Sequence, residues 1–591
     1  MSRLLYAAAM AWTLGTVGQG HAAEPKAILE GELSPDLKLI IEQTIGSMDR
    51  PVESRFEARR RARAAAEDAI AVLRAEGYYA YAVVPDVSET EPPRPLVRVM
   101  PGVLFVVRDP ALVWRGAPPD PIATDQAVAA LRLPTGTPGR AADILAAEGR
   151  VLAVVQKRGY ADVEAEPRDV VVDHADNSVR PTFNIRTGSL VRLGGLDIQG
   201  DQRTNHGYLR GLAPWKAGAV YDPEEVAELE RRLSETGVYD SVTVALSPPS
   251  AMGSDGQRPV IVSLSARKPR TLEAGASYST SEGAGVNARW THYDRLSRAD
   301  TIGLFGQVSN RDTRAGGEVS LPHWRRGQQT LTTGLQAYRI RTDAFDETGF
   351  GISTDVTRRY NRTSYATLGA SLDYSKTDEI RAQTLTPLGR NLVTLAALGD
   401  VALDRSDDPL DPSKGWRISG RVEPTLILGD TNLPYLRAVA QGSYYLALDP
   451  KAATVIAGRL RLGRILNGRV EDIPASQRFF AGGGGSVRGF SFQGVGPRLS
   501  DTTPQGGVFL MESSLEVRRE LTSIWGIAAF VDAGAVGSGG PADFNDLALG
   551  AGFGVRYNLG FAPIRVDIAT PLVRRRGEAL FQLYVSIGQS F

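Results

Sequence analysis

Residues 581–591, Phe-Gln-Leu-Tyr-Val-Ser-Ile-Gly-Gln-Ser-Phe, end the chain in a strand-like pattern. Neighbours along a β-strand point to opposite faces, so alternation of side-chain type indicates a sheet with two different surroundings. One face would carry Phe581, Leu583, Val585, Ile587 and Phe591, and the other Gln582, Tyr584, Ser586 and Ser590. A strand between lipid and an aqueous lumen has this character. A soluble β-sandwich could end in the same way, so this strand alone leaves both folds open.

The same alternation extends back to about residue 269. Ile302, Leu304 and Val308 alternate with small or polar residues, apart from Phe305, and Leu460 and Leu462 alternate with Arg459 and Arg461. At roughly 20 residues for each strand and its connection, the region 269–591 holds about sixteen strands, an even number suited to closure. Open strand edges cannot be left in hydrocarbon. The sequence therefore predicts a transmembrane antiparallel β-barrel over 269–591.

The first half of the chain repeats a different pattern. A helical stretch ends at a glycine, a hydrophobic or aromatic residue follows, and a strand-like run comes next; the glycines are Gly77, Gly159 and Gly237. Glycine suits that position because the residue after a helix commonly turns left-handed. The spacing of about 80 residues fits small domains. We therefore expect three α+β modules, over 23–108, 109–188 and 189–268.

The third module has the clearest local signals. Asp222 can cap a helix, Pro223 suits the first helical position, and Glu225 completes a capping box. Val226, Leu229 and Leu233 recur at helical spacing, which predicts a buried face. Alternating runs at 241–246 and 260–264 predict the strands that close the module.

The N-terminus has the pattern of an export signal. An apolar stretch over 4–17 follows Arg3, and Gly20-His21-Ala22 supplies the small residues of a cleavage site, so residues 1–22 are predicted to be a signal peptide. The apolar stretch is too short to span a bilayer as a helix. We therefore expect an exported protein.

Composition excludes several classes of site. The chain has no Cys, which rules out disulfides and thiolate metal sites, and its formal net charge is zero, which gives no reason to expect a nucleic-acid partner. The basic run 59–63 could contact anionic lipid, but a solvated helix face explains it more simply.

A long connection between two predicted strands, near 451–465 and 506–519, holds Arg478-Phe479-Phe480-Ala481-Gly482-Gly483-Gly484-Gly485-Ser486-Val487-Arg488-Gly489-Phe490. Its last four residues, Val487, Arg488, Gly489 and Phe490, resemble the loop motif of the POTRA-barrel outer-membrane assembly superfamily. Phe530-Val531-Asp532-Ala533-Gly534 is similar to the strand motif whose carboxylate receives that arginine. The resemblance implies an ion pair between Arg488 and Asp532 that holds the loop in the lumen, where an unpaired arginine would be costly.

Further matches extend the resemblance over the mature chain. The stretch 404–416 is similar to the family's hairpin signature, and 562–567 to its penultimate strand, in which Arg565 and Asp567, two residues apart, would face the lumen together. Three modules before a barrel are similar to the TamA-like members. The terminal Phe591 resembles the C-terminal signal by which outer-membrane barrels are recognised for assembly.

Nothing in the sequence favours an enzyme or a cofactor. The run Gly482–Gly485 lacks the Lys-Ser/Thr and the helix of a phosphate-binding loop. Asp404, Asp407, Asp408 and Asp411 lack the order of an EF-hand, so a turn is the better interpretation. His174, His206, His292 and His323 are not spaced as metal ligands.

The resemblance implies a function. The chain would lie in the outer membrane with its modules in the periplasm, and would help to insert or secrete β-barrel proteins such as autotransporters. Expected partners are a TamB-like inner-membrane-anchored protein, unfolded outer-membrane protein clients and membrane lipid. Client strands would pair at a weak seam between the first and last strands, near 271–280 and 579–591. The alternative is a two-partner-type secretion pore for one dedicated exoprotein.

Overall fold

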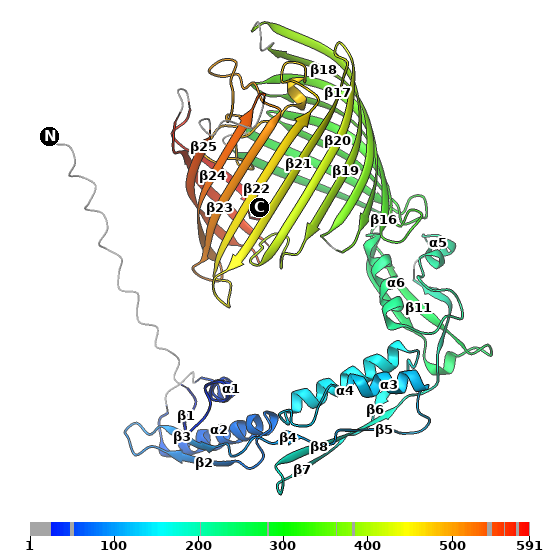
Figure 1. Ribbon diagram of the computed structural model, residues 1–591, viewed down its shortest axis with the longest axis vertical. Helices are drawn as coiled ribbons and strands as arrows, with labels where there is room; N and C mark the ends of the chain where they lie inside the picture. The colour runs from blue at the N-terminus through cyan, green and yellow to red at the C-terminus, as the bar shows by residue number, and fades with distance from the viewer. Residues whose placement is uncertain are drawn as a thin grey trace, which may run out of the picture. The chain divides into compact units, whose positions relative to one another are not determined.

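The computed structural model describes residues 25–47, 52–200, 203–279, 283–361, 363–380, 385–539, 547–560, 562–574, 578–589 and 591. The predicted signal peptide, 1–22, lies outside the described residues. The chain forms small α+β modules followed by a large barrel (Figure 1). It divides into two compact units: one holds the first two modules and part of the third, and the other holds the rest of the third module and the barrel.

Each module begins with one or two strands, continues with two helices and ends with further strands. The first contains β1 (Ile28–Glu30), α1 (Pro35–Ile45), α2 (Arg55–Ala75), β2 (Ala82–Val87) and β3 (Pro95–Met100). The second contains β4 (Val106–Val107), β5 (Ala111–Trp114), α3 (Pro121–Ala130), α4 (Ala141–Lys157), β6 (Glu164–Ala165), β7 (Asp169–Asp173) and β8 (Ser178–Arg186). The third contains β9 (Arg192–Gln199), α5 (His206–Gly211), α6 (Pro223–Glu235), β10 (Tyr239–Leu246), the 3₁₀ turn η1 (Pro249–Ala251) and β11 (Gln257–Ala266).

In all three modules the last strand lies in the middle of the sheet. The strand orders are β1-β3-β2, β4-β8-β5 with β6 and β7 also on β8, and β10-β11-β9. The first strand runs parallel to the last in the first module, and β5 runs parallel to β8 in the second. Helices make the crossover that a parallel pair needs. The residue boundaries between modules stay a prediction.

The glycines that ended the predicted helices have left-handed backbones. Gly77, Gly159 and Gly237 have φ of +92°, +100° and +72°. A side chain would strain each of these positions, which explains the repeated pattern in the sequence. The predicted inner face of α6 is also confirmed, since Val226, Leu229 and Leu233 are all buried.

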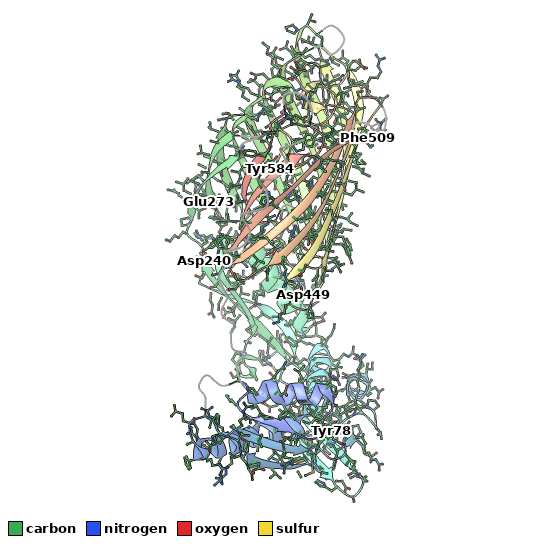
Figure 2. All side chains as sticks on the ribbon, turned by 90° about the vertical axis from the view of Figure 1, so that its left-hand side faces the viewer. Tyr78, Asp240, Glu273, Asp449, Phe509 and Tyr584 are labelled. Atoms are coloured by element: carbon green, nitrogen blue, oxygen red, sulfur yellow. The ribbon has the colours of Figure 1, made fainter. Side chains whose placement is uncertain are left out.

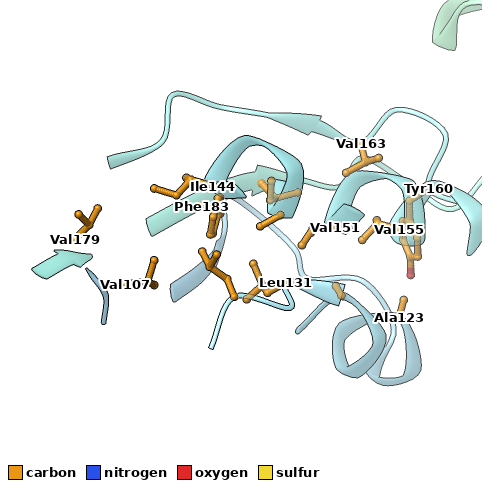
Figure 3. Packing of buried hydrophobic residues seen from close by; sticks show 14 of the residues in the cluster. Val107, Ala123, Leu131, Ile144, Val151, Val155, Tyr160, Val163, Val179 and Phe183 are labelled. Atoms are coloured by element: carbon orange, nitrogen blue, oxygen red, sulfur yellow. The ribbon is translucent and has the colours of Figure 1, made fainter. Parts of the chain in front are cut away.

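The second module shows how such a small domain is held together. Its apolar core joins α4 to α3 and β8, through Ile144, Val151, Val155, Ala123 and Phe183 (Figure 3). Most of these side chains are fully buried. Each buried aliphatic or aromatic side chain contributes about 1.5–3 kcal/mol of transfer free energy, so one shared core holds the helices on the sheet.

The barrel is one closed antiparallel sheet of sixteen strands, β12 to β27 in sequence order. The predicted barrel is therefore confirmed. Its strands are β12 (Arg270–Ser279), β13 (Gly283–Tyr293), β14 (Thr301–Ser309), β15 (Asp312–Leu321), β16 (Gln329–Arg341), β17 (Phe345–Arg359), β18 (Tyr365–Ile380), β19 (Pro387–Asp404), β20 (Gly415–Gly429), β21 (Leu433–Ala447), β22 (Thr454–Leu466), β23 (Phe509–Glu520), β24 (Trp525–Gly537), β25 (Ala548–Asn558), β26 (Pro563–Pro571) and β27 (Gln582–Ile587).

The strand pattern separates an apolar outside from a polar inside. Leu304, Leu460 and Val585 are exposed on the outer face, where lipid would cover them. Asp449 and Phe509 mark opposite ends of the barrel (Figure 2). None of the helices in the described part of the chain is both long enough and apolar enough to cross a bilayer.

A buried histidine links a barrel turn to the third module. His323, 8% exposed in the turn after β15, lies with Nε2 2.7 Å from the carbonyl oxygen of Arg232 in α6, and its Nδ1 accepts the Gln328 N–H at 3.0 Å. These two contacts require a neutral ring with its proton on Nε2. Burial lowers the pKa of His323, because the charged ring would lose its hydration; the nearby charge of Arg232 lowers it further, and the hydrogen bond to the Arg232 carbonyl opposes the shift.

This histidine should make the stability of the junction depend on pH. A lowered folded pKa means that the unfolded chain binds the proton first, so the contribution is present above about pH 6.5 and is lost as the pH falls through the folded pKa. We expect the unfolding free energy of the parent to fall more between about pH 7 and pH 5 than that of His323→Gln, which keeps a donor and an acceptor but does not titrate. Equal losses in urea titrations of both proteins would contradict this assignment.

Candidate functional site: the lumen loop and its charged anchor

The connection between β22 and β23, residues 467–508, is the segment we call the lumen loop. It folds back on itself, with Phe479 bridged to Gly507 and Ala481 to Val495. Val487 and Phe490 are buried in one apolar cluster with Val536 of β24. Packing against the barrel wall therefore holds the loop inside the barrel, together with the contacts of Arg488.

Arg488 and Asp532 meet at the centre of the site. Arg488 Nε donates to Asp532 Oδ2 at 2.7 Å and Nη2 donates to Oδ1 at 2.9 Å, while the Arg488 backbone N–H donates to Oδ2 at 3.0 Å. The structure thus places the two predicted partners in a two-pronged ion pair. The guanidinium carbon also lies over the ring of Phe530, 3.3 Å from the ring centre. Planar arginine suits such double recognition, whereas lysine does not.

Two further carboxylates close the site around the same guanidinium. Arg488 Nη1 donates to Glu516 Oε2 at 2.8 Å and lies 3.3 Å from Asp567 Oδ2. Arg556 contacts both of these carboxylates, Arg518 Nε donates to Glu516 at 2.9 Å, and Arg565 Nε lies 3.4 Å from Asp567. Four guanidiniums and three carboxylates thus share one network on β23 to β26 and the loop. A buried charge of either sign is tolerated only when it is paired in this way.

Glycines allow the loop to approach the wall closely. Gly489 has φ of +99°, and a Cβ there would lie 2.8 Å from the carbonyl carbon of Thr570 in β26. A Cβ at Gly550 in β25 would collide with the Arg488 carbonyl oxygen. The arginine reaches its partners because side chains are missing on both sides of the contact.

Sequence reasoning missed several members of the site. Glu516 and Arg518 carried a usable signal, because they are charged residues two apart on a strand whose other face is apolar. Tyr584 carried none. Its hydroxyl accepts the Gly489 N–H at 3.2 Å and donates to the Phe490 carbonyl at 3.3 Å, and its place on β27 is labelled in Figure 2. Only the closed barrel brings the last strand beside the loop motif.

The terminal Phe591 lies elsewhere than the strand pattern indicated. The last strand ends at Ile587, and the Phe591 ring lies 5.4 Å from the guanidinium of Arg459 and 5.6 Å from that of Arg518. Both arginines point into the lumen. The expectation that Phe591 shares the lipid face of Phe581 is therefore wrong, because the backbone leaves the strand first. Its role as an assembly signal stays a prediction.

The aspartates of the stretch 404–411, which could suggest a metal site, serve instead to shape a turn. Asp407 and Asp408 accept backbone N–H groups within the turn 405–414, as from Ser413 to Asp407 at 2.8 Å. Burial alone would raise the pKa of Asp407, but hydrogen bonds from Ser413 and Lys414 lower it on balance. Within the described ranges, no group of three potential ligands is placed to hold a metal.

The basic run of the first module lies on one side of α2. Ala58 and Ala62 of α2 face the core, and Arg61 pairs with Glu57 at 2.6 Å. This arrangement is typical of a solvated helix face, and we assign no site to it.

Comparison with known protein families agrees with this geometry. A family model described as the Omp85 superfamily domain matches residues 295–591. The chain belongs to the Omp85 superfamily. A second model, POTRA, described as the surface antigen variable number repeat, matches residues 191–266, within the third module. The predicted membership of a POTRA-barrel outer-membrane assembly and secretion family is thereby confirmed, as is the location: an Omp85 barrel lies in the outer membrane with its POTRA modules in the periplasm.

Relatives of this Omp85 protein include two curated outer membrane protein assembly factors named BamA. The one from Neorickettsia risticii is 22% identical over 451 residues, covering 72% of this chain and 58% of the relative. The one from Neisseria meningitidis is 21% identical over 507 residues, covering 75% and 62%. The matched regions therefore span about three-fifths of those relatives' lengths.

Solved structures resemble the Omp85 fold of this chain. BamA from Haemophilus ducreyi lacking POTRA domains 1–3 has a TM-score of 0.66 at 18% identity, covering 82% of this chain and all of that one. CdiB from Acinetobacter baumannii has a TM-score of 0.47 at 14% identity, covering 82% and 90%.

Proposed function

We propose that this Omp85 protein is an outer-membrane assembly factor on which unfolded β-barrel proteins pair their strands before they enter the membrane. The observation that supports this most directly is the seam between the first and last strands. Among the described residues, one registered pair, Ser279 with Tyr584, joins β12 to β27. By contrast, β12 and β13 share ten registered pairs.

Opening of this seam would make the edges of β12 and β27 available for pairing with another strand. An unpaired strand edge is a row of backbone donors and acceptors that an extended client can complete by β-augmentation. A cavity of about 520 Å³ lies at the seam, lined among others by Gly283, Asn287, Gly484 and Tyr584. The lining is rich in small residues, so a client backbone could approach closely.

The partners follow from the same proposal. Clients would be unfolded outer-membrane proteins, with autotransporters among them, and a TamB-like protein anchored in the inner membrane would work with the N-terminal modules. The similarity to the family's three-module members, seen in the sequence, supports this finer assignment. Catalysis has no part in the proposal, because strand pairing forms no covalent bond.

A two-partner-type secretion pore for a dedicated exoprotein is the second candidate. The lumen of the barrel would then be the route of export, and the lumen loop would have to leave it. The anchored loop favours the first candidate, since buried Asp532 would lose its arginine, and Glu516 and Asp567 would each lose one of theirs, if the loop left.

Reconstitution tests the choice. The purified full chain in liposomes should accelerate the folding of a urea-denatured outer-membrane barrel, measured as the appearance of its heat-resistant band on a gel. Liposomes with an unrelated sixteen-strand barrel are the control. No acceleration over that control, combined with large conductance steps in a planar bilayer, would favour the secretion pore instead.

A further inference from the structure

The lumen loop touches the barrel wall in a second place, on other strands than those of the Arg488 network. Glu379, at the end of β18 and 5% exposed, lies with Oε1 2.8 Å from Arg390 Nη2 on β19. Its other oxygen, Oε2, lies 3.3 Å from Arg478 Nη2 in the loop and accepts the Ala475 N–H at 2.5 Å. Arg478 and Arg390 are also buried.

The two arginines connect this carboxylate to the folded base of the loop. Arg478 Nε donates to the Ile473 carbonyl and Nη1 to the Gln505 carbonyl, both at 2.9 Å. Arg390 Nη1 donates to the Asp472 carbonyl at 2.9 Å and Nη2 to the Glu471 carbonyl at 3.1 Å. Arg390 of β19 therefore holds two loop carbonyls directly. Glu379 of β18 holds two more through its ion pair with Arg478.

Apolar contacts also hold this part of the loop against the barrel wall. Ala475 packs with Ala344 and Phe345 in a buried cluster, against which Phe480 of the loop also packs. The rings of Phe345 and Phe480 have centres 6.3 Å apart. The ion pair is therefore buried beside apolar side chains. The low dielectric of such surroundings strengthens the attraction between its charges.

The two contacts lie on different parts of the wall. Arg478 meets β18 and β19, whereas Arg488 meets β23 to β26, and in the strand order β18 and β23 are five strands apart. Ten residues separate the two arginines, and Arg459 of β22 donates to the carbonyls of Gly485 and Ser486 between them. The segment is therefore held at its two ends by different strands, and loss of one end contact should free that end alone.

We propose that Glu379 is a second fastening point of the lumen loop, a positioning residue that holds the Arg478 end against β18 and β19 independently of the Arg488 network. Loss of its charge would leave two buried guanidiniums without a carboxylate. The Arg478 end of the loop would then open more often, while the Arg488 end would stay in place. The inference concerns the position of the loop and does not rest on the proposed function.

The absence of cysteine from the chain allows a direct test in the full-length folded protein. Ala475→Cys reports on the Arg478 end and Val487→Cys on the Arg488 end, because both positions are buried. The rate of reaction with a maleimide measures how often each end opens. With Glu379→Gln, labelling at position 475 should rise about tenfold or more, and labelling at 487 should change by less than about twofold. Asp532→Asn should give the reverse.

Controls separate a local change from general loosening. Glu318→Gln removes the carboxylate of an ion pair with Arg289, which lies between strands and outside the loop, and should alter neither rate. Heat-modifiable migration confirms that each variant is folded. Should Glu379→Gln fail to fold, Glu379→Asp and Arg478→Lys carry the same comparison. Unchanged labelling at 475, or equal increases at both ends in every variant, would overturn the proposal.

Discussion

Replacing Arg488 by alanine should destabilise the barrel by about 3–5 kcal/mol and abolish most assembly activity. The substitution leaves Asp532 without its two-pronged partner, and Glu516 loses one of its three arginines, at positions with essentially no exposure. Uncompensated buried charge costs more than the lost contact itself. The unfolding free energy in urea and the rate of client folding in liposomes measure the two effects.

A double-mutant cycle tests whether the pair acts as a unit. Asp532→Ala should cost a similar amount, and the double variant should be little worse than either single one, because the second change removes a group already unpaired. Arg421→Ala is the matched control. That arginine pairs with Asp400 at 2.8 Å in the lumen but is half-exposed, so its loss should cost under about 1 kcal/mol. Fully additive losses for Arg488 and Asp532 would show that they do not act together.

Cross-linking the seam should stop client assembly almost completely. Ser279 lies opposite Tyr584 on the two antiparallel strands, so the next positions along both strands are Tyr278 and Val585. Cysteines at these two positions form the only disulfide possible in this chain. Oxidation would join β12 to β27 and prevent a client strand from pairing between them, and activity should fall at least about tenfold and return on reduction.

The control disulfide joins two strands that have no reason to separate. Leu446 and Ile456 are registered partners on β21 and β22. Cross-linking them tests the effect of oxidation alone and should leave client folding unchanged. Full activity with the oxidised seam would show that clients do not enter between the first and last strands.

Some of the charged partners could be predicted from the sequence, and others could be found only from the tertiary structure. Arg488 and Asp532 were found from local motifs, because each stands in a distinctive run of residues. Glu516, Arg518 and Arg556 stand in ordinary strand sequence, and their convergence depends on the register of β23 to β26. Glu379 and Arg478 are about a hundred residues apart, and no local pattern connects them.

The terminal strand was also predicted only in part from the sequence. Alternation correctly placed Phe581 and Val585 outside and Tyr584 inside. It failed at Phe591, because strand periodicity describes side chains only while the backbone stays extended, and the strand ends at Ile587. The contacts of Phe591 with Arg459 and Arg518 depend on where the free end of the chain turns.

The sequence by itself determined the local properties of this protein: helices that end at glycine, strands with one apolar face, and a closed barrel that leaves no open edge in lipid. Periodicity and turn chemistry act over a few residues, so a single chain displays them. Tertiary structure decided which strands face the lumen loop, where the seam lies and which charges meet. Those contacts join residues far apart in the chain, and only closure of the sixteen strands brings them within a few ångströms.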